Sequence, residues 1–130
     1  MKLKYFIYLI FFTQLGVFSQ ELPPIEIFKP KDYAAEDQNW GVSQGNDKSI
    51  YFANNKGLLS YNGSRWKLYK SSNSSIFRSV KVIGDKIYTG SYMDFGFWKK
   101  NKYGTLKYTS ISSNEEISLA EDEEFWNILE

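Results

Sequence analysis

From Trp40 onward, hydrophobic and polar residues alternate in short runs that are separated by turn-forming residues. The runs are rich in Trp, Tyr, Phe, Ile and Val, whereas Gly, Asn, Asp and Ser stand between them. Alternation with a period of two in such residues is typical of half-buried β-strands. The predicted strands are, in chain order, NWGVSQ, SIYFAN, GLLSYNG, WKLYK, RSVKVIG, KIYTGS, FGFWKK and LKYTS.

The first four predicted strands recur in the last four, at a spacing of 37 to 39 residues. The matched pairs are Ile50 with Ile87, Tyr51 with Tyr88, Tyr61 with Trp98, Val42 with Val80, and Tyr69 with Tyr108. Four strands in a repeat of about forty residues are typical of a β-propeller blade. Gly63, after Asn62, and Gly84 suit tight turns between such strands.

The repeat divides the chain into two predicted blades, at residues 38–75 and 76–113. Residues 114–130 then follow as a linker and the first strand of a third blade, because Trp126 and Ile128 repeat the spacing of Trp40 and Val42. The predicted fold class is therefore all-β, a partial β-propeller with two four-stranded antiparallel blades and the first strand of a third. We expect a fragment of a longer propeller.

The N-terminal residues 1–19 have the layout of a secretory signal peptide, predicted as a helix. Lys2 and Lys4 precede an apolar run, and small residues follow near Ser19, so we expect cleavage before Gln20. An uncleaved anchor is the alternative, although the run is shorter than the about 20 residues that span a bilayer. The sequence thus predicts export to the periplasmic or extracytoplasmic side of the inner membrane.

Residues 20–37 contain all three prolines, Pro23, Pro24 and Pro30. Proline disfavours both helix interiors and central strands, so this segment is predicted to be an extended arm. Ile25, Ile27 and Phe28 would give the arm an apolar side with which to dock.

Composition excludes several classes of function but does not identify one. Aromatic residues make up 18% of the chain, which favours β structure, and the formal charge of +1 gives no reason to expect contact with nucleic acid. The absence of Cys and His excludes disulfides, thiolate metal sites and His-based triads. The acidic run at 121–124 lacks the glycine and spacing of a calcium loop. We expect no metal, no cofactor and no catalytic residue.

The stretch WGVSQ, IYFANN, GLLSYNG and the following Trp66 resembles the two-component regulator propeller repeat. Together with DQNW and GSYMDFGFWKKNKYGTLKY, it is similar to the N-terminus of bacterial sensor-regulators that also carry a triple-tyrosine domain. The resemblance implies a propeller that senses outside the cytoplasm and signals through a membrane helix to a helix-turn-helix or kinase module. Residues 20–130 show no pattern typical of these output modules.

Propeller ligands tend to meet the loops between the second and third strands and the entry to the first strand. On this chain those loops give five candidate ligand-binding residues, Asn55, Lys56, Arg78, Tyr92 and Asp94. We expect Arg78 and Asp94 to pair and Tyr92 to offer a stacking surface. The alternative is that all five are solvated loop residues.

The tryptophans Trp40, Trp66, Trp98 and Trp126 are predicted to pack in the core or between blades, with sugar stacking as the alternative. Three functions remain. The first is a non-catalytic exported sensory segment whose partner is a small ligand, with a glycan as one class. The second is a scaffold that completes a propeller by assembly, with missing blades or with itself. The third is an enzyme acting on polysaccharides, for which only carboxylate acid and base catalysis is available.

Overall fold

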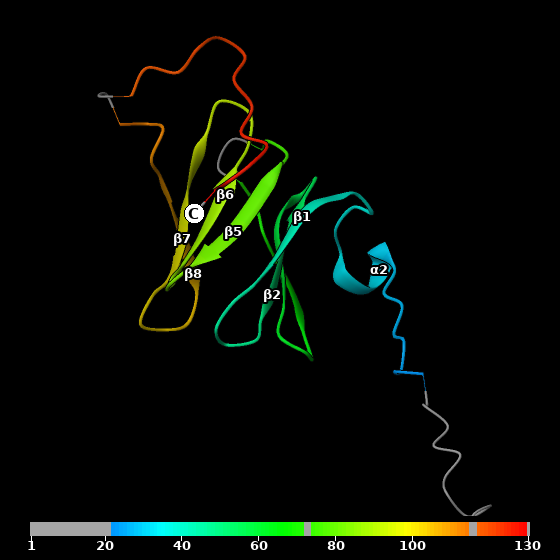
Figure 1. Ribbon diagram of the computed structural model, residues 1–130. Helices are drawn as coiled ribbons and strands as arrows, with labels where there is room; N and C mark the ends of the chain where they lie inside the picture. Colours follow the sequence, from blue (N-terminus) through cyan, green and yellow to red (C-terminus); the bar gives the residue numbers. More distant parts are fainter. Residues whose placement is uncertain (1–21, 72–73, 115–116, 130) are drawn as a thin grey trace, which may run out of the picture.

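The computed structural model describes residues 22–71, 74–114 and 117–129. These residues form two antiparallel four-stranded sheets and one short helix (Figure 1). The all-β prediction is therefore confirmed. The predicted signal peptide lies outside the described residues. Within the part that the structure describes, no helix is long and apolar enough to cross a membrane.

Each sheet is a meander in which consecutive strands pair. Sheet A has the order β1-β2-β3-β4 and sheet B the order β5-β6-β7-β8. The eight strands coincide closely with the eight predicted runs. They are β1 (Asn39–Gln44), β2 (Ile50–Asn54), β3 (Gly57–Tyr61), β4 (Trp66–Tyr69), β5 (Ser79–Ile83), β6 (Lys86–Gly90), β7 (Phe95–Lys100) and β8 (Leu106–Ser110).

Strand pairing places most of the matched residues at equivalent positions in the two sheets. Ile50 pairs with Tyr61, which pairs with Trp66, and Ile87 in the same way pairs with Trp98, which pairs with Tyr108. The match of Tyr69 with Tyr108 is wrong, because Trp66 holds the equivalent position. The β7–β8 hairpin extends beyond Trp98 by the pairs of Lys99 and Lys100, and this extension changes the register.

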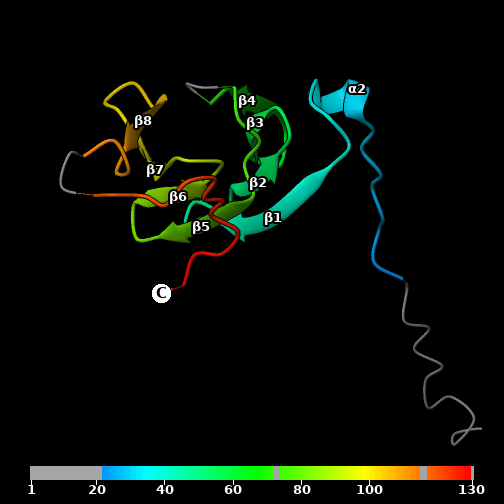
Figure 2. The same ribbon diagram turned by 90° about the horizontal axis from the view of Figure 1, so that it is seen from above.

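The two sheets meet through one face of each. Strand β1 lies beside β5, and the backbone N–H of Val82 donates a hydrogen bond to Ser43 Oγ at 2.9 Å. Viewed from above, the sheets diverge from β1 and β5 toward β4 and β8 (Figure 2). The shared core consists of Tyr51, Ala53, Leu58, Phe77, Val80, Ile87, Trp98 and Leu106.

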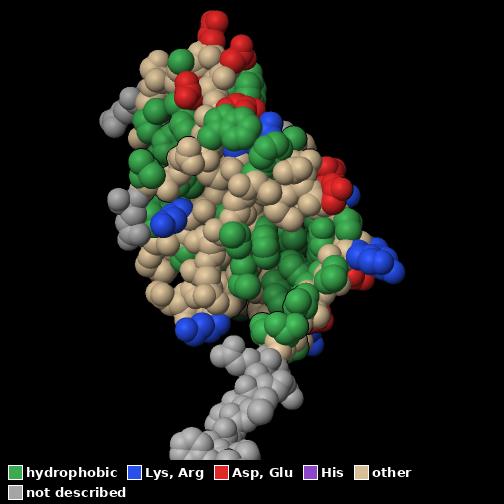
Figure 3. Space-filling model, turned by 45° about the vertical axis from the view of Figure 1, so that its right-hand side comes forward, with side chains coloured by type: hydrophobic (Ala, Val, Ile, Leu, Met, Phe, Trp, Pro, Cys, Tyr) green, Lys and Arg blue, Asp and Glu red, His purple; other side chains and the backbone are tan. Residues whose placement is uncertain are grey.

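The opposite face of sheet A is covered by the N-terminal arm. Phe28 lies 5.1 Å from Trp66 between ring centres, and Tyr33 is buried against the same indole. Contrary to the prediction of a purely extended arm, Pro30–Tyr33 forms a short helix, α2. Proline is tolerated in the first turn of a helix, because its missing N–H is not needed there. Figure 3 shows hydrophobic side chains gathered on this side, next to the start of the described chain.

Within residues 117–129, the described part of the predicted third blade, no strand is formed. Residues 121–128, here called the C-terminal strap, contribute one isolated bridge between Glu124 and Tyr92. The bridge joins the strap to the β6–β7 loop and not to one of the eight strands. Gly90 permits the close approach, since a Cβ there would lie 2.5 Å from Phe125 Cβ.

Candidate functional site

The predicted ligand-binding residue Arg78 is enclosed by aromatic rings. Its guanidinium carbon lies 4.6 Å from the centre of the Trp40 ring and 4.7 Å from that of Trp126. The same group forms an ion pair with Glu124, with 3.3 Å between Nη2 and Oε1. The expected pairing of Arg78 with Asp94 is therefore wrong. Arg78 therefore holds the C-terminal strap in place, and little of its side chain is exposed for contact with a ligand.

Asp94 is occupied by hydroxyl groups of its own sheet. Its carboxylate accepts hydrogen bonds from Tyr108 Oη at 2.9 Å and from Ser110 Oγ and Ser112 Oγ, both at 2.6 Å. Burial, together with the hydrogen bond to Asp94, raises the pKa of Tyr108 well above its usual range. Asp94 thus fixes the end of β8 against the β6–β7 loop.

The remaining candidates lie at the same end of the molecule as Arg78. Asn55 Oδ1 accepts a hydrogen bond from Trp40 Nε1 at 2.8 Å. The Tyr92 hydroxyl donates to Asp122 at 2.6 Å, and this bond raises the pKa of the exposed phenol. Lys56 is exposed to solvent. The structure therefore brings Asn55, Arg78 and Tyr92 to one end, but as parts of a network that joins the arm, both sheets and the strap.

The four tryptophans differ sharply in burial. Trp98 is only 4% exposed, and its Nε1 donates to Thr89 Oγ1 at 3.0 Å. Trp66 is half-buried beneath the arm. Trp40 and Trp126 are 42% and 47% exposed, so neither belongs to the core, and Trp40 instead contacts Arg78 next to the neighbouring sheet, as packing between blades requires. The two rings enclose the Arg78 guanidinium.

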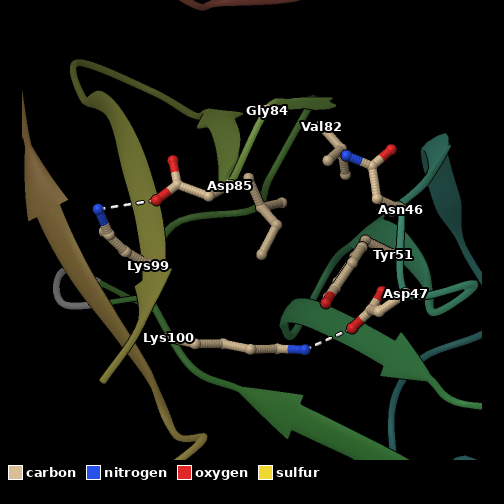
Figure 4. Close-up of a pocket in the computed structure, with 10 residues that line it drawn as sticks. Asn46, Asp47, Tyr51, Val82, Gly84, Asp85, Lys99 and Lys100 are labelled. Atoms are coloured by element: carbon tan, nitrogen blue, oxygen red, sulfur yellow. Dashed lines mark hydrogen bonds and ion pairs between the residues drawn. The ribbon is translucent and has the colours of Figure 1, made fainter. Parts of the chain in front are cut away.

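A site that the sequence did not reveal lies between the sheets at their other end (Figure 4). It is a cavity of about 300 Å³. The β1–β2 loop, the β5–β6 turn and the end of β7 form its walls. The lining residues are Gly45, Asn46, Asp47, Tyr51, Val82, Gly84, Asp85, Ile87, Lys99 and Lys100.

Two ion pairs flank the cavity. Lys99 Nζ lies 2.7 Å from Asp85 Oδ2, within sheet B, and Lys100 donates a hydrogen bond to Asp47 across the gap between the sheets. The hydrogen bond from Lys100 lowers the pKa of Asp47, and that from Lys99 lowers the pKa of Asp85. Burial raises the pKa of the Tyr51 phenol. At neutral pH the wall therefore carries two ion pairs, whose charges cancel.

The signal for this cavity in the sequence is weak. Asp47 and Asp85 both lie in Gly-containing turns between the first and second strands of their sheets, but Asp is expected in turns. Their lysine partners, Lys99 and Lys100, come from the end of β7. Only the packing of sheet A on sheet B brings Lys100 to Asp47, and strand patterns do not specify that packing.

In the part of the chain that the structure describes, no group of three or more acidic, His or Cys side chains could hold a metal ion. The Asp47 and Asp85 carboxylates are each neutralised by a lysine, so the cavity suits polar binding better than proton transfer. Comparison of the chain with protein-family models, curated proteins and solved structures finds no match.

Proposed function

We propose that this chain is a non-catalytic, exported, ligand-recognition segment of a β-propeller that belongs to a signal-transduction regulator. The support for blades is the pair of four-stranded meanders, which repeat the same cross-strand positions and diverge from neighbouring first strands. The support for recognition is the cavity between the sheets, and this is the observation on which the proposal depends.

The lining of the cavity favours a small uncharged ligand with several hydroxyl groups, such as a saccharide. A hydroxyl both donates and accepts, so it can bond Asp47 and Lys100 together without separating their charges. A ligand with a net charge would have to break one of the two ion pairs. The aliphatic side chains of Val82 and Ile87 suit the C–H face of a sugar ring.

Catalysis is not part of the proposal, because the available acids are in the wrong protonation state. A general acid is most effective when its pKa lies near the working pH. The lysine partners lower the pKa of Asp47 and Asp85, and the pKa of Tyr51 is raised. Near neutral pH, the carboxylates have no proton to donate and the phenol retains its own.

The proposal is tested by thermal unfolding with a panel of mono- and disaccharides. A ligand that binds only the folded chain stabilises it by RT ln(1 + [L]/Kd), about 2.7 kcal/mol at one hundred times Kd. We expect a concentration-dependent rise in Tm for the wild type that is lost in Lys100→Met. The control is Lys102→Met, an exposed lysine of the β7–β8 loop outside the cavity lining. A rise that survives in Lys100→Met, or no rise with any saccharide, contradicts the proposal.

Assembly is a second candidate function, and it is favoured by a groove on the side of sheet B that faces away from sheet A. The groove has a volume of about 290 Å³. It is lined by Tyr88, Thr89, Phe95, Gly96, Ile111, Phe125, Asn127 and Ile128. Light scattering of the full chain tests this function directly, because a strictly monomeric protein excludes self-assembly.

A further inference from the structure

The side of sheet B that faces away from sheet A, here called the outer face, carries a regular set of side chains. Val80, Ile87 and Trp98 belong to the core shared with sheet A. Since successive side chains of a strand point to opposite faces, their neighbours Lys81, Tyr88 and Phe97 belong to the outer face. The outer face extends from the C-terminal strap at one end of the strands to the β5–β6 turn at the other (Figure 1).

The middle of the outer face is apolar on β6 and β7, next to Lys81 of β5. Tyr88 and Phe97 are paired across β6 and β7, with 5.9 Å between ring centres. Phe95 lies on the same side of β7, 4.7 Å from Phe125 of the strap. All three residues of the sheet are only partly buried. A partner that covered them would remove aromatic surface from water, which favours association.

One end of the outer face is basic. Lys86 pairs with Lys99, and Lys99 pairs with Lys107, so three lysines lie side by side on adjacent strands. Adjacent strands are about 4.8 Å apart, so three positive charges gather at this end. Lys86 Nζ lies 4.3 Å from the centre of the Phe97 ring. Asp85 is paired with Lys99. One carboxylate does not neutralise three lysines, so the row keeps a net positive charge and attracts further negative charge.

The other end is acidic. Glu121, Asp122 and Glu123 of the strap are exposed, and the backbone oxygen of Glu123 accepts a hydrogen bond from Met93 N at 2.8 Å. Met93 precedes β7, whereas Lys99 lies near the end of that strand. At about 3.3 Å per residue, the acidic and basic ends are separated by on the order of 20 Å. Phe97 lies between them.

We infer that the outer face of sheet B binds the outer face of a second copy of this chain about a two-fold axis near Phe97. Such an axis places the acidic end of each copy over the basic end of the other and buries the apolar middle of both. A face that is basic at one end and acidic at the other is self-complementary, as a two-fold interface requires. This inference rests on the assembly function proposed above and does not depend on ligand binding in the cavity.

The charges favour a second copy of the chain as the partner of the outer face. The alternative is an uncharged sheet that packs on sheet B in the way that sheet B packs on sheet A. In sheet A, Tyr51 and Leu58 hold the positions equivalent to Tyr88 and Phe95 and are buried in the shared core. A similarly apolar occupant on sheet B would offer no anionic partner to Lys86 and Lys107, whereas Lys99 already has Asp85. The strap of a second copy supplies them.

Sedimentation velocity and light scattering of the full chain test the inference. We expect a monomer–dimer equilibrium that weakens at least tenfold in dissociation constant between 50 and 500 mM NaCl, because charge pairs are screened by salt. Lys86→Glu with Lys107→Glu gives the face a net negative charge, and Glu121→Lys with Glu123→Lys gives it a net positive charge. Each double variant alone should be monomeric, and an equimolar mixture of the two should form a heterodimer.

Lys31→Glu with Lys70→Glu, both exposed and outside the outer face, is the matched control and should dimerise as the wild type does. A wild type that is monomeric at all concentrations overturns the inference, as do oligomers larger than a dimer or a mixture that stays monomeric. Circular dichroism confirms that each variant is folded. Saccharide-induced stabilisation is measured separately, so failure of the cavity proposal and failure of the dimer are distinguishable.

Discussion

The guanidinium carbon of Arg78 lies 4.6 Å from the centre of the Trp40 ring. Arg78 stands just before β5 and Trp40 lies in β1, so this contact joins the entries to the first strands of the two sheets. Trp126 covers the guanidinium from the strap, and its ring meets that of Trp40 at 81°. One arginine thus links three segments that are distant in the sequence.

Arg78→Ala is predicted to release the C-terminal strap. The substitution removes two cation–π contacts and leaves Glu124 without its ion-pair partner, so we expect a loss of about 2 kcal/mol in the free energy of unfolding. Urea unfolding measures this loss. Hydrogen exchange measures the strap itself, because the Phe125 amide donates to Ser91 O and should exchange faster in the variant.

Arg65→Ala is the control for this variant, since Arg65 is an exposed arginine in the β3–β4 turn. We expect its unfolding and its Phe125 exchange to match the wild type within error. Unchanged Phe125 exchange in Arg78→Ala would show that the strap does not depend on the arginine.

Trp98 and Trp126 occupy different environments, which predicts unequal costs of truncation. Trp98→Ala should lose about 3–5 kcal/mol, because it leaves a cavity in the shared core and removes the hydrogen bond to Thr89. Trp126→Ala should lose about 1 kcal/mol, because that ring is half-exposed and its main contact is with Arg78. Chemical unfolding of both variants checks the order. Equal losses would contradict the assigned burial.

Strand positions could be predicted from the sequence because alternation and turn residues are local signals. The repeat placed Ile50 with Ile87 and Tyr61 with Trp98 at equivalent positions, as strand pairing shows. The longer β7–β8 hairpin could not be predicted, because residue identity alone matched Tyr69 to Tyr108 across it. Local pattern determines strands, whereas hairpin length determines register.

The candidate site was harder to predict, because its residues depend on contacts between segments far apart in the chain. Arg78 and Asp94 were both expected at the loop end, but no sequence pattern indicates that Glu124 and Ser110 are their partners. The pairing of Asp47 with Lys100 likewise arises only when the sheets pack. Composition identified the charged groups but not their neighbours.

Phe28 is predicted to shield Trp66 from solvent. Phe28→Ala removes a ring that lies 5.1 Å from the indole and 5.2 Å from Tyr61, so acrylamide quenching of tryptophan fluorescence should increase. We expect a loss of about 1–2 kcal/mol in the free energy of unfolding, because the side chain is only partly buried. Ile27→Ala is the control, since Ile27 is 79% exposed and should change neither quantity. Equal quenching in Phe28→Ala and the wild type argues against a docked arm.

The ion pair between Asp47 and Lys100 is predicted to make stability depend on pH in two windows. The hydrogen bond from Lys100 lowers the pKa of Asp47 below 3.8 in the folded chain. The pair therefore contributes fully above the unfolded pKa of Asp, and its contribution is lost as the pH falls through the folded value. The pKa of Lys100 is raised above 10.5, so the contribution is also lost as the pH rises through that folded value.

Asp47→Asn measures this contribution, because the amide oxygen can still accept the hydrogen bond from Ser49 N while the charge is removed. Both partners are nearly half-exposed, so we expect the wild type to be more stable by only about 0.5 kcal/mol at pH 6. The difference should vanish as the pH falls through the lowered, folded pKa of Asp47. It should also shrink in 1 M NaCl and be absent in a Lys100→Met background. A difference that stays constant from pH 2 to 7 would show that the charge pair does not stabilise the contact between the sheets.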